Sequence, residues 1–521
     1  RSLCTSRLAA QVLMAALPKS EDDPLLSSGD QNEDVRVKTY DGGHDRALSP
    51  SPDGPLEFSC MTNTLVICLL VAPLPNIAFG YDVGSVGGVL DSIEDALDLT
   101  TFETELMIAQ YYLGAAIGGL VSGKVADAYG RRAALGLSSS LFIVGIIFQG
   151  LAQSFEVLLV GRMIAGLGAG VSWVACGVYA TEVAPVSIRG LTVCLVDLAI
   201  NMGLVFGYVA ALACFGTNMN WRGVIFLGAI FPIAVLVLLP FVPESPRWTM
   251  LKLGDVEAAK AALLLIESES ANAEGRYADL AKLKASSTDL GAEPTFRDVF
   301  STQAGRGAFF IAIAMGFLQQ ASGTEAILYY SSNMLEACGV TKEKYILWFQ
   351  VGISVCKLLG EVAVLPFVDR VGRRPMLLAS SVGLCMGLGC LAISYADAWP
   401  AEYGVLLLGL IMLFFSLGVG PITLVVVGEV SSTRFRGMMI SSSIFVNRIT
   451  SGIVAFTFLS LKFAFGSEAK VFVFYTLWSL AALLFYYTTV PELSSVELDS
   501  ASSSLSLPPG YKYFMGNVDG S

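Results

Sequence analysis

An acidic residue inside an apolar segment is the feature of this sequence best suited to chemistry. Asp82 lies in the apolar run 62–90. A carboxylate inside a membrane span is costly and usually has a function. Arg162 lies in the run 156–178. At a rise of about 1.5 Å per residue, the two side chains would lie at similar depths, about 9 to 12 Å below the same membrane surface, so they could pair.

The expected role of this pair is to take up and release a proton. Asp82 should stay ionised while the Arg162 guanidinium is close. It should accept a proton when the guanidinium moves away, because burial disfavours the charged carboxylate. A static ion pair is the alternative. We expect the proton to be the coupling ion and expect no cofactor.

Histidine and cysteine usage excludes several other kinds of site. The single histidine, His44, lies in a polar N-terminal segment, so catalytic triads, histidine zinc sites and histidine proton relays have no residue inside the fold. The ten cysteines are scattered and form no C-x-x-C pair, which indicates neither a disulfide framework nor a metal site. We therefore predict that the protein is not an enzyme and binds no metal.

Composition shows which elements must position these residues. The chain has 521 residues, 54% of them hydrophobic and 15% charged, and its mean hydropathy is +0.65. Soluble proteins average about 45–50% apolar and about 25% charged residues, which excludes a large soluble protein. The net charge of −12 argues against a nucleic-acid partner. The sequence indicates a polytopic protein surrounded by membrane lipids.

Twelve apolar runs are long enough to cross a bilayer, which takes about 20 helical residues per crossing. These runs must be helical, because lipid-exposed backbone has to satisfy its own hydrogen bonds. We therefore predict an all-α fold of twelve transmembrane helices in two six-helix halves. The predicted spans are 62–90, 104–126, 133–151, 156–178, 188–213, 222–242, 306–335, 344–367, 375–396, 402–428, 437–461 and 468–490.

The remaining segments are polar. Basic residues gather in every second loop, that is, in the loops on one side of the membrane. By the positive-inside rule this side is the cytoplasm, which places both termini there. An acidic di-leucine-like string at Glu21–Leu26 fits a plasma membrane or a vacuole-like membrane. The oligomeric state stays open, with a monomer as the default. The predicted domains are a disordered cytoplasmic tail (1–60), a first half (61–243), a cytoplasmic helical linker (244–305), a second half (306–491) and a cytoplasmic tail (492–521).

Short motifs repeat between the two halves. Tyr129–Arg132 recurs as Val371–Arg374, and Glu182–Gly190 recurs as Glu429–Gly437. Six spans per half is an even number, so both halves insert the same way up. This is the pattern of a transporter with two rocking halves that are related by an axis along the membrane normal.

The motifs, taken in order, resemble the sugar porter family of the major facilitator superfamily over residues 62–493. The motifs are Phe79-Gly80-Tyr81-Asp82, Gly123…Asp127…Gly130-Arg131-Arg132, Gly161-Arg162, Pro243-Glu244-Ser245-Pro246-Arg247, Gln319-Gln320…Ser322-Gly323 with Tyr329-Tyr330, and Asp369-Arg370-Val371-Gly372-Arg373-Arg374-Pro375.

This resemblance implies a secondary active transporter that moves a sugar or sugar-like polyol by alternating access. In the family, an aspartate at the position of Asp82 accompanies proton symport, whereas facilitative glucose transporters carry asparagine. The resemblance also implies that Gln319, Gln320, Tyr329 and Asn447 contact the sugar; a helix–helix contact is the alternative. Ser322-Gly323 is expected to break its helix, which allows the outer part to move as a gate.

Several pocket positions depart from the family. Asp197 and Glu325 replace amide residues, Leu424 replaces a tryptophan, and Arg448 stands where another tryptophan is common. The charged residues could pair with each other, since charges inside a membrane seek partners, or they could bind a charged solute such as a sugar acid. A nutrient sensor that binds without transporting is a further alternative.

Charged residues at the cytoplasmic helix ends form the last candidate site. They could pair across neighbouring helices, closing the cytoplasmic side while the cavity faces outward and separating when it faces inward. The alternative is that they serve membrane topology alone. The residues are Asp127, Arg131, Arg132, Glu182, Arg189, Asp369, Arg373, Glu429 and Arg436.

Overall fold

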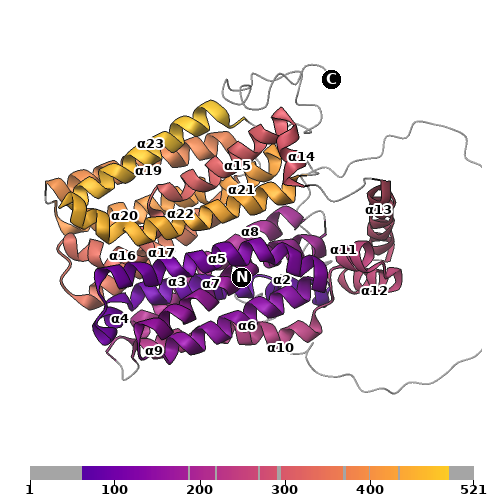
Figure 1. The fold of residues 1–521 in the computed structure, drawn as a ribbon, viewed down its shortest axis with the longest axis horizontal. Helices are drawn as coiled ribbons and strands as arrows, with labels where there is room; N and C mark the ends of the chain where they lie inside the picture. The colour runs from indigo at the N-terminus through magenta and orange to yellow at the C-terminus, as the bar shows by residue number, and fades with distance from the viewer. Residues whose placement is uncertain are drawn as a thin grey trace, which may run out of the picture.

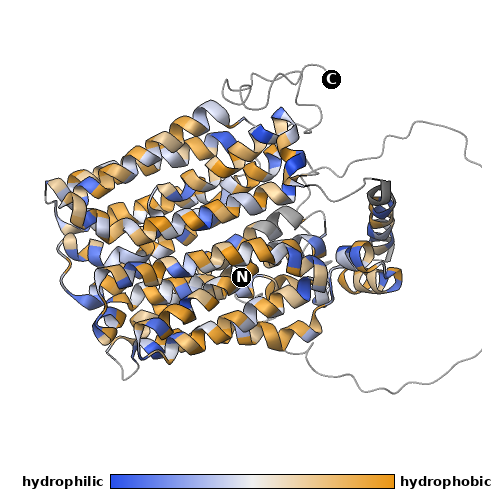
Figure 2. Ribbon diagram, viewed as in Figure 1, coloured by the Kyte–Doolittle hydropathy of each residue, from blue (hydrophilic) through white to orange (hydrophobic). Residues whose placement is uncertain are grey.

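The computed structural model describes residues 62–185, 188–216, 220–267, 270–289, 295–367, 371–397, 399–431 and 435–491. Within these residues the chain is helical and contains no strand, as predicted. The tail predicted to be disordered, 1–60, and the predicted cytoplasmic tail, 492–521, lie outside the described residues. The fold is a polytopic helical bundle, and its hydropathy is arranged accordingly: in Figure 2 the long helices are mostly orange, whereas α13 carries more blue.

Eleven helices in the described part of the chain are long and apolar enough to cross a membrane. The seventh of the twelve predicted spans is also present, but as two shorter helices, α15 (Gln303–Ala321) and α16 (Thr324–Ala337). Three other spans contain two segments each: α2 (Asn63–Val71) with α3 (Leu74–Gly88), α9 (Trp221–Leu227) with α10 (Ile230–Leu238), and α20 (Ala401–Ser416) with α21 (Val419–Val430). The unbroken spans are α5 (Thr101–Tyr129), α6 (Arg131–Gly150), α7 (Phe155–Val183), α8 (Arg189–Cys214), α17 (Glu343–Val364), α19 (Arg373–Ala396), α22 (Arg436–Phe465) and α23 (Glu468–Thr489).

The two halves lie side by side with their helices running in the same general direction (Figure 1). The linker helices α11 (Pro246–Trp248), α12 (Val256–Ile266) and α13 (Ser270–Asp289) project at one end of the bundle, which we call the linker side. The short helix α4 (Leu90–Leu97) and α9 lie at the opposite end, which we call the far side.

Glycines fix the depth and rotation of the helices that carry the charged pair. A Cβ atom at Gly80 of α3 would lie 1.8 Å from the Ile200 carbonyl oxygen of α8. A Cβ atom at Gly166 of α7 would lie 2.1 Å from the Tyr111 carbonyl oxygen of α5. Small residues let membrane helices approach this closely and pack over a large area. The helices that hold Asp82 and Arg162 are therefore fixed by backbone contact on either side.

The linker docks on the N-terminal half. α12 buries Ala259, Leu263 and Ile266, so this helix of the linker packs one apolar face against the protein. Thr62 Oγ1 donates a hydrogen bond to the Ile266 carbonyl at 2.8 Å. On α13, Arg276 Nη2 donates to the Glu182 carbonyl at 3.1 Å, which satisfies one of the free carbonyls at the end of α7.

Candidate functional site

Asp82 and Arg162 pair in the middle of the N-terminal half. Arg162 Nη1 on α7 donates a hydrogen bond to Asp82 Oδ2 on α3. Gln149 Nε2 on α6 donates to the other carboxylate oxygen, Oδ1, at 3.3 Å. Arg162 is fully buried and Asp82 is 5% exposed. The pairing expected from their depths is thus present, and removing either partner would leave an uncompensated buried charge.

Arg162 also contacts the opposite half. Its Nη2 donates to the hydroxyl of Tyr329 on α16 at 3.3 Å. Its guanidinium lies 4.3 Å from the ring centroid of Tyr111 on α5, a distance at which a cation and an aromatic face attract. Because Tyr329 belongs to the C-terminal half, movement of the halves changes what surrounds Arg162, and therefore Asp82.

A cavity of about 420 Å³ lies between the halves, within the size range of small-molecule sites. It extends from mid-depth toward the linker side, where the last turns of α7 and α17 and the first turns of α8 and α22 line it. Its lining residues include Phe79, Tyr112, Trp173, Asp197, Gln319, Gln320, Glu325, Lys357, Glu361, Leu424 and Arg448.

The four residues expected to contact a sugar divide into two pairs. Gln319 and Gln320 line the cavity, whereas Tyr329 and Asn447 are not among its lining residues in this conformation. Asn447 Nδ2 instead donates to Gln319 Oε1 at 2.6 Å, and Tyr329 contacts Arg162. That these two residues touch the solute stays a prediction; in this conformation both are engaged with other side chains.

Gln320 is the residue best prepared to bind a hydroxyl group. It is 3% exposed, and its Oε1 is buried without a hydrogen-bond partner in the described residues. By contrast, Gln319 Nε2 already donates to the carbonyls of Val419 at 3.1 Å and Gly420 at 2.7 Å. A buried acceptor left unpaired is costly, so a solute hydroxyl that donates to Gln320 would relieve that cost.

The helix break expected at Ser322-Gly323 is present. α15 ends at Ala321, Gly323 has φ +80°, and α16 begins at Thr324. A side chain at Gly323 would also collide with the ring of Tyr475, 2.7 Å from the Cβ position. The break separates Gln319 and Gln320 from the outer segment that carries Glu325 and Tyr329.

Of the three charged residues that depart from the family pattern, two lie together. Arg448 Nη2 lies 3.9 Å from Glu325 Oε1, and Tyr112 donates from its hydroxyl to Glu325 Oε2 at 2.6 Å. The Arg448 guanidinium also lies 4.4 Å from the ring centroid of Trp173. The pairing alternative thus holds for Glu325 and Arg448 but leaves out Asp197.

Asp197 instead lies near two charged residues that sequence reasoning missed, Lys357 and Glu361 on α17. The signal was available: two ionisable residues one helical turn apart inside the apolar run 344–367. Ionisable residues within a span usually face the bundle interior and have a function.

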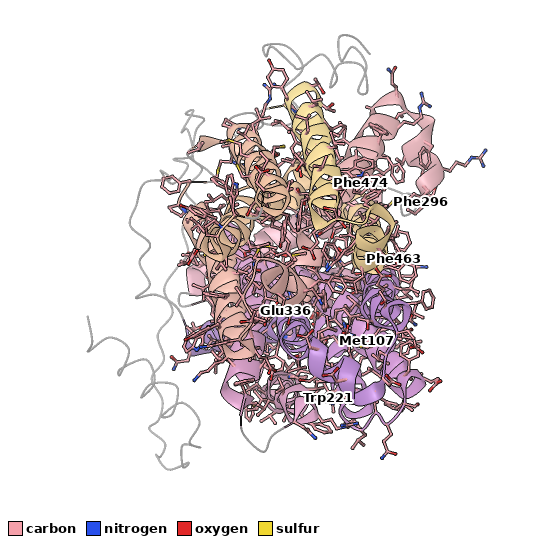
Figure 3. The ribbon with its side chains drawn as sticks, turned by 90° about the vertical axis from the view of Figure 1, so that its left-hand side faces the viewer. Met107, Trp221, Phe296, Glu336, Phe463 and Phe474 are labelled. Carbon is pink, nitrogen blue, oxygen red and sulfur yellow. The ribbon has the colours of Figure 1, made fainter. Side chains whose placement is uncertain are left out.

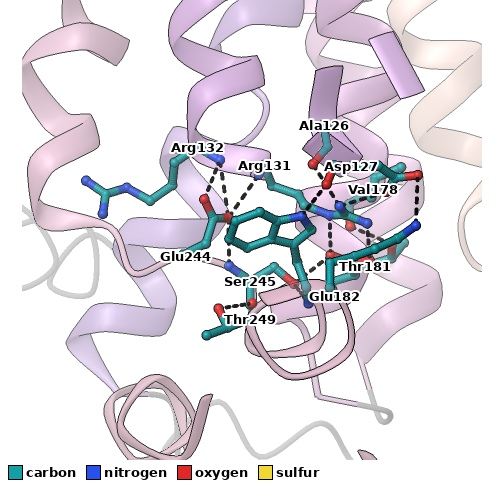
Figure 4. Close-up of polar contacts among 12 residues, drawn as sticks. Ala126, Asp127, Arg131, Arg132, Val178, Thr181, Glu182, Glu244, Ser245 and Thr249 are labelled. Atoms are coloured by element: carbon teal, nitrogen blue, oxygen red, sulfur yellow. Dashed lines mark hydrogen bonds and ion pairs between the residues drawn. The ribbon is translucent and has the colours of Figure 1, made fainter. Parts of the chain in front are cut away.

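The predicted cytoplasmic residues form a dense network in the N-terminal half (Figure 4). Arg131 donates to Asp127 Oδ1 at 3.0 Å and to both oxygens of Glu182, at 2.8 and 3.0 Å. Ser245 Oγ donates to Glu182 Oε2 at 2.6 Å. Arg132 does not pair with Asp127; its Nη2 donates to the Leu239 carbonyl at 2.9 Å. Arg131 therefore joins α5, α6 and α7 at their linker-side ends.

The C-terminal half repeats one of these pairs. Arg373 Nε lies 3.0 Å from Glu429 Oε1, matching the pair of Arg131 and Glu182 in the sequence repeat. The Nε of Arg436 is buried without a hydrogen-bond partner in the described residues. Asp369 lies outside the described residues, and the side chain of Arg189 is not described.

The predicted pairing across neighbouring helices is therefore present, but each of these pairs lies within a single half. The cavity reaches the linker side while the pairs remain formed. That the pairs separate during the cycle stays a prediction. Because each pair lies within one half, opening between the halves does not by itself pull it apart.

The far side is closed by hydrogen bonds between the halves. Glu105 on α5 is fully buried and accepts from the backbone N–H of Ser460 on α22 at 2.8 Å. Ser332 on α16 donates to Asp91 Oδ1 on α4 at 3.2 Å. Glu336 also lies at this end, near the boundary between the halves (Figure 3). Desolvation, together with Glu94 and Glu336, raises the pKa of Asp91 to about 6.

Comparisons with known proteins agree with this architecture. The profile of a family described as "Sugar (and other) transporter" matches residues 67–504. Probable polyol transporter 4 of Arabidopsis thaliana is 30% identical over 442 residues, which cover 84% of this chain and 84% of the relative. The galactose-proton symporter of Escherichia coli (strain K12) is 29% identical over 449 residues, which cover 85% of this chain and 94% of the relative.

Among solved structures, the xylose transporter XylE from E. coli has a similar fold. Its partially occluded inward open conformation matches with a TM-score of 0.72 at 22% identity, covering 84% of this chain and 100% of that one. The fold is therefore that of the major facilitator superfamily, with two halves of six spans. On these grounds the chain belongs to the sugar transporter family, as its motifs indicated, and it is an integral membrane transporter rather than an enzyme.

Proposed function

We propose that this chain is a proton-coupled symporter of a polyol or hexose, with Asp82 as the group that carries the proton. The observation that supports this most directly is the chain of contacts from Asp82 through Arg162 to Tyr329, which joins the carboxylate to the opposite half. The polyol and galactose-proton transporters among the relatives support the solute class and the coupling.

The coupling works through the surroundings of Arg162. While Tyr329 holds the guanidinium in place, Asp82 has a partner that favours its ionised form. When the halves part on the far side, Arg162 loses Tyr329, Asp82 can take a proton from water, and the solute can bind. Return to the present arrangement brings Arg162 back and expels the proton toward the cavity. The only covalent bond that forms and breaks in this cycle is the O–H bond of the Asp82 carboxyl group.

In this proposal the solute lies between Gln320 of the C-terminal half and the aromatic residues of the N-terminal half. Gln320 supplies a free acceptor and Gln319 is oriented by Asn447, while Phe79 and Trp173 line the same cavity and supply aromatic surface for the apolar side of a sugar ring. Binding residues contributed by both halves are what alternating access requires, because closure around the solute then depends on its presence.

The orientation and membrane belong to the same proposal. Basic residues such as Arg131, Arg132 and Arg373 mark the linker side as cytoplasmic, which would place both termini in the cytoplasm and open the present cavity inward. A plasma membrane or a vacuole-like membrane fits a nutrient symporter, working as a monomer.

The test is uptake of labelled galactose, xylose and sorbitol into proteoliposomes, with and without an imposed pH gradient. We expect gradient-driven accumulation that Asp82→Asn abolishes, because the amide cannot take up a proton, while exchange between labelled and unlabelled solute continues. Glu402→Gln, which removes an exposed carboxyl at the start of α20, should behave like the wild type. Unchanged accumulation in Asp82→Asn would remove the coupling role from this residue.

A second candidate solute is an anionic sugar derivative, favoured by the presence of Arg448 in the cavity lining. Arg448→Trp should then abolish uptake of labelled glucuronate while sparing galactose. If neither uptake profile changes, Arg448 is a structural partner of Glu325 and Asn447.

A further inference from the structure

A second group of ionisable residues lies in the cavity, separate from Asp82 and Arg162. Asp197 and Asn201 lie one turn apart on α8 of the N-terminal half, and Lys357 and Glu361 lie one turn apart on α17 of the C-terminal half. All four line the cavity. α8 and α17 pack against each other, so this group spans the boundary along which the halves must move.

The charges of this group do not balance. Lys357 Nζ donates a hydrogen bond to Asn201 Oδ1 and lies 5.8 Å from the ring centroid of Phe415. Glu361 is 3% exposed, and neither of its carboxylate oxygens has a hydrogen-bond partner among the described residues. Its charged neighbours are Asp197 and Lys357. Two carboxyl groups therefore face one ammonium group.

The other charges of the cavity do not supply the missing positive charge. Arg448 lies beside Glu325, and Arg162 is engaged by Asp82. A buried carboxylate without a partner is costly, so a cation must occupy this place during at least part of the cycle. A proton fits best, because two carboxyl groups that share a site hold one proton between them, and the adjacent Lys357 repels a larger cation.

We propose that Asp197 and Glu361 form a second proton-binding site, so that each solute crosses with two protons. The inference rests on the proposed symport function. A carboxylate oxygen takes the proton from water when the far side is open. When α8 and α17 move further apart on the linker side than they are in the present arrangement, the carboxyl groups separate, water reaches each of them, and the proton leaves to that water.

The test is the proton stoichiometry of the full-length chain in proteoliposomes with the membrane potential held at zero. At equilibrium, a gradient of one pH unit concentrates a solute about 100-fold if two protons accompany it, and about tenfold if one does. For labelled galactose or sorbitol we expect about 100-fold in the wild type and about tenfold in Glu361→Gln and in Asp197→Asn. Glu402→Gln should keep the wild-type ratio.

Folding is checked by exchange of labelled for unlabelled solute at equal pH, which needs binding and movement of the halves but no net proton flux. Should Glu361→Gln fail this check, Asp197→Asn and a direct count of protons entering per galactose in the wild type, measured with a pH electrode, decide the question. A count of two supports the proposal.

Three results would overturn or redirect it. A wild-type ratio of about tenfold that Glu361→Gln leaves unchanged overturns the second proton and leaves the role of Asp82 intact. Additional accumulation driven by a Na⁺ gradient overturns the assignment of a proton to this site. Absence of any pH-driven accumulation in the wild type overturns the symport function itself.

Discussion

The two sides of the bundle are held together in different ways. On the linker side, the pair of Arg131 with Glu182 and the pair formed by Arg373 each lie within one half. On the far side, bonds such as that from Ser460 to Glu105 join one half to the other. Charged residues at the linker side therefore stiffen each half as a body, and the bonds at the far side determine that the present cavity is reached from the linker side.

This difference indicates which contacts must be lost when the transporter changes the side to which its cavity opens. Opening the far side requires the loss of hydrogen bonds to Glu105 and Asp91, while the ion pairs of Arg131 can persist throughout. We expect new contacts between the halves to form on the linker side in the opposite conformation. Arg436, whose buried Nε has no hydrogen-bond partner in the described residues, is a suitable donor for one of them.

Locking the far side should have the largest effect. In Asp91→Cys/Ser332→Cys, oxidation would join α4 to α16 where Ser332 now donates to Asp91. We expect nearly complete loss of galactose uptake, restored by reductant, because a closed far side blocks the cycle. Uptake that persists in the oxidised protein, with the cross-link verified by proteolysis, would show that this contact does not have to open.

The matched control lies on the linker side. Asp127→Cys/Lys252→Cys joins the N-terminal half to the part of the linker that is docked on it, at positions whose charged atoms are 4.0 Å apart. Because both move with the same half, the same oxidation should leave uptake nearly unchanged. The four single-cysteine variants are oxidised in the same way, and any loss of uptake in them measures cross-linking to the native cysteines.

Removing the ion pairs should have an intermediate effect, on stability rather than on the cycle. Arg131→Ala leaves Glu182, which is 9% exposed, without its guanidinium partner, which we expect to cost about 3 kcal/mol of unfolding free energy. Arg373→Ala should cost about 1 kcal/mol, because Glu429 is 25% exposed and better screened. Thermal unfolding in detergent measures both, and equal shifts would contradict the distinction.

The smallest effect should come from pH acting on Asp91. Its pKa of about 6 in the closed arrangement exceeds the value of about 3.9 for an aspartate in water. The closed far side thus binds a proton that the open one releases. Closure is favoured most below about pH 4, weakens as the pH rises from about 4 to about 6, and does not weaken further above that. Because Asp91 is an exposed residue, screening limits the change to about two- or threefold.

Spin labels at Ser92→Cys and Lys342→Cys, two exposed positions on opposite halves at the far side, would measure this closure by their distance distribution at each pH. Asp91→Asn should make the distribution independent of pH in that window. A pH response of equal size in Asp91→Asn would assign it to another acid.

The sequence was sufficient for features that depend on one helix or on depth in the membrane. The depths of Asp82 and Arg162 predicted their pairing, and the glycine after Ser322 predicted the break between α15 and α16. Motif order predicted the family. Each of these follows from local chemistry and from the length of a span, which a sequence states directly.

Features that depend on how the halves meet could not be predicted in the same way. The spans are apolar almost all round, so periodicity did not show that Lys357 and Glu361 face Asp197, or that Tyr329 faces Arg162 rather than the cavity. The sequence also serves two conformations at once. The hydrogen bonds of Glu105 form in only one of these conformations, and no pattern of residue types shows which conformation that is.

The docking of the linker has a practical consequence. α12 and α13 are hydrogen-bonded to the N-cap of α2 and to α7 in the N-terminal half. α14 (Phe296–Ser301) packs on α15 in the C-terminal half. The two parts of the linker therefore move with different halves. A donor dye on α13 and an acceptor dye on α14 would therefore report each transport cycle as a change in fluorescence resonance energy transfer, without any label near the solute.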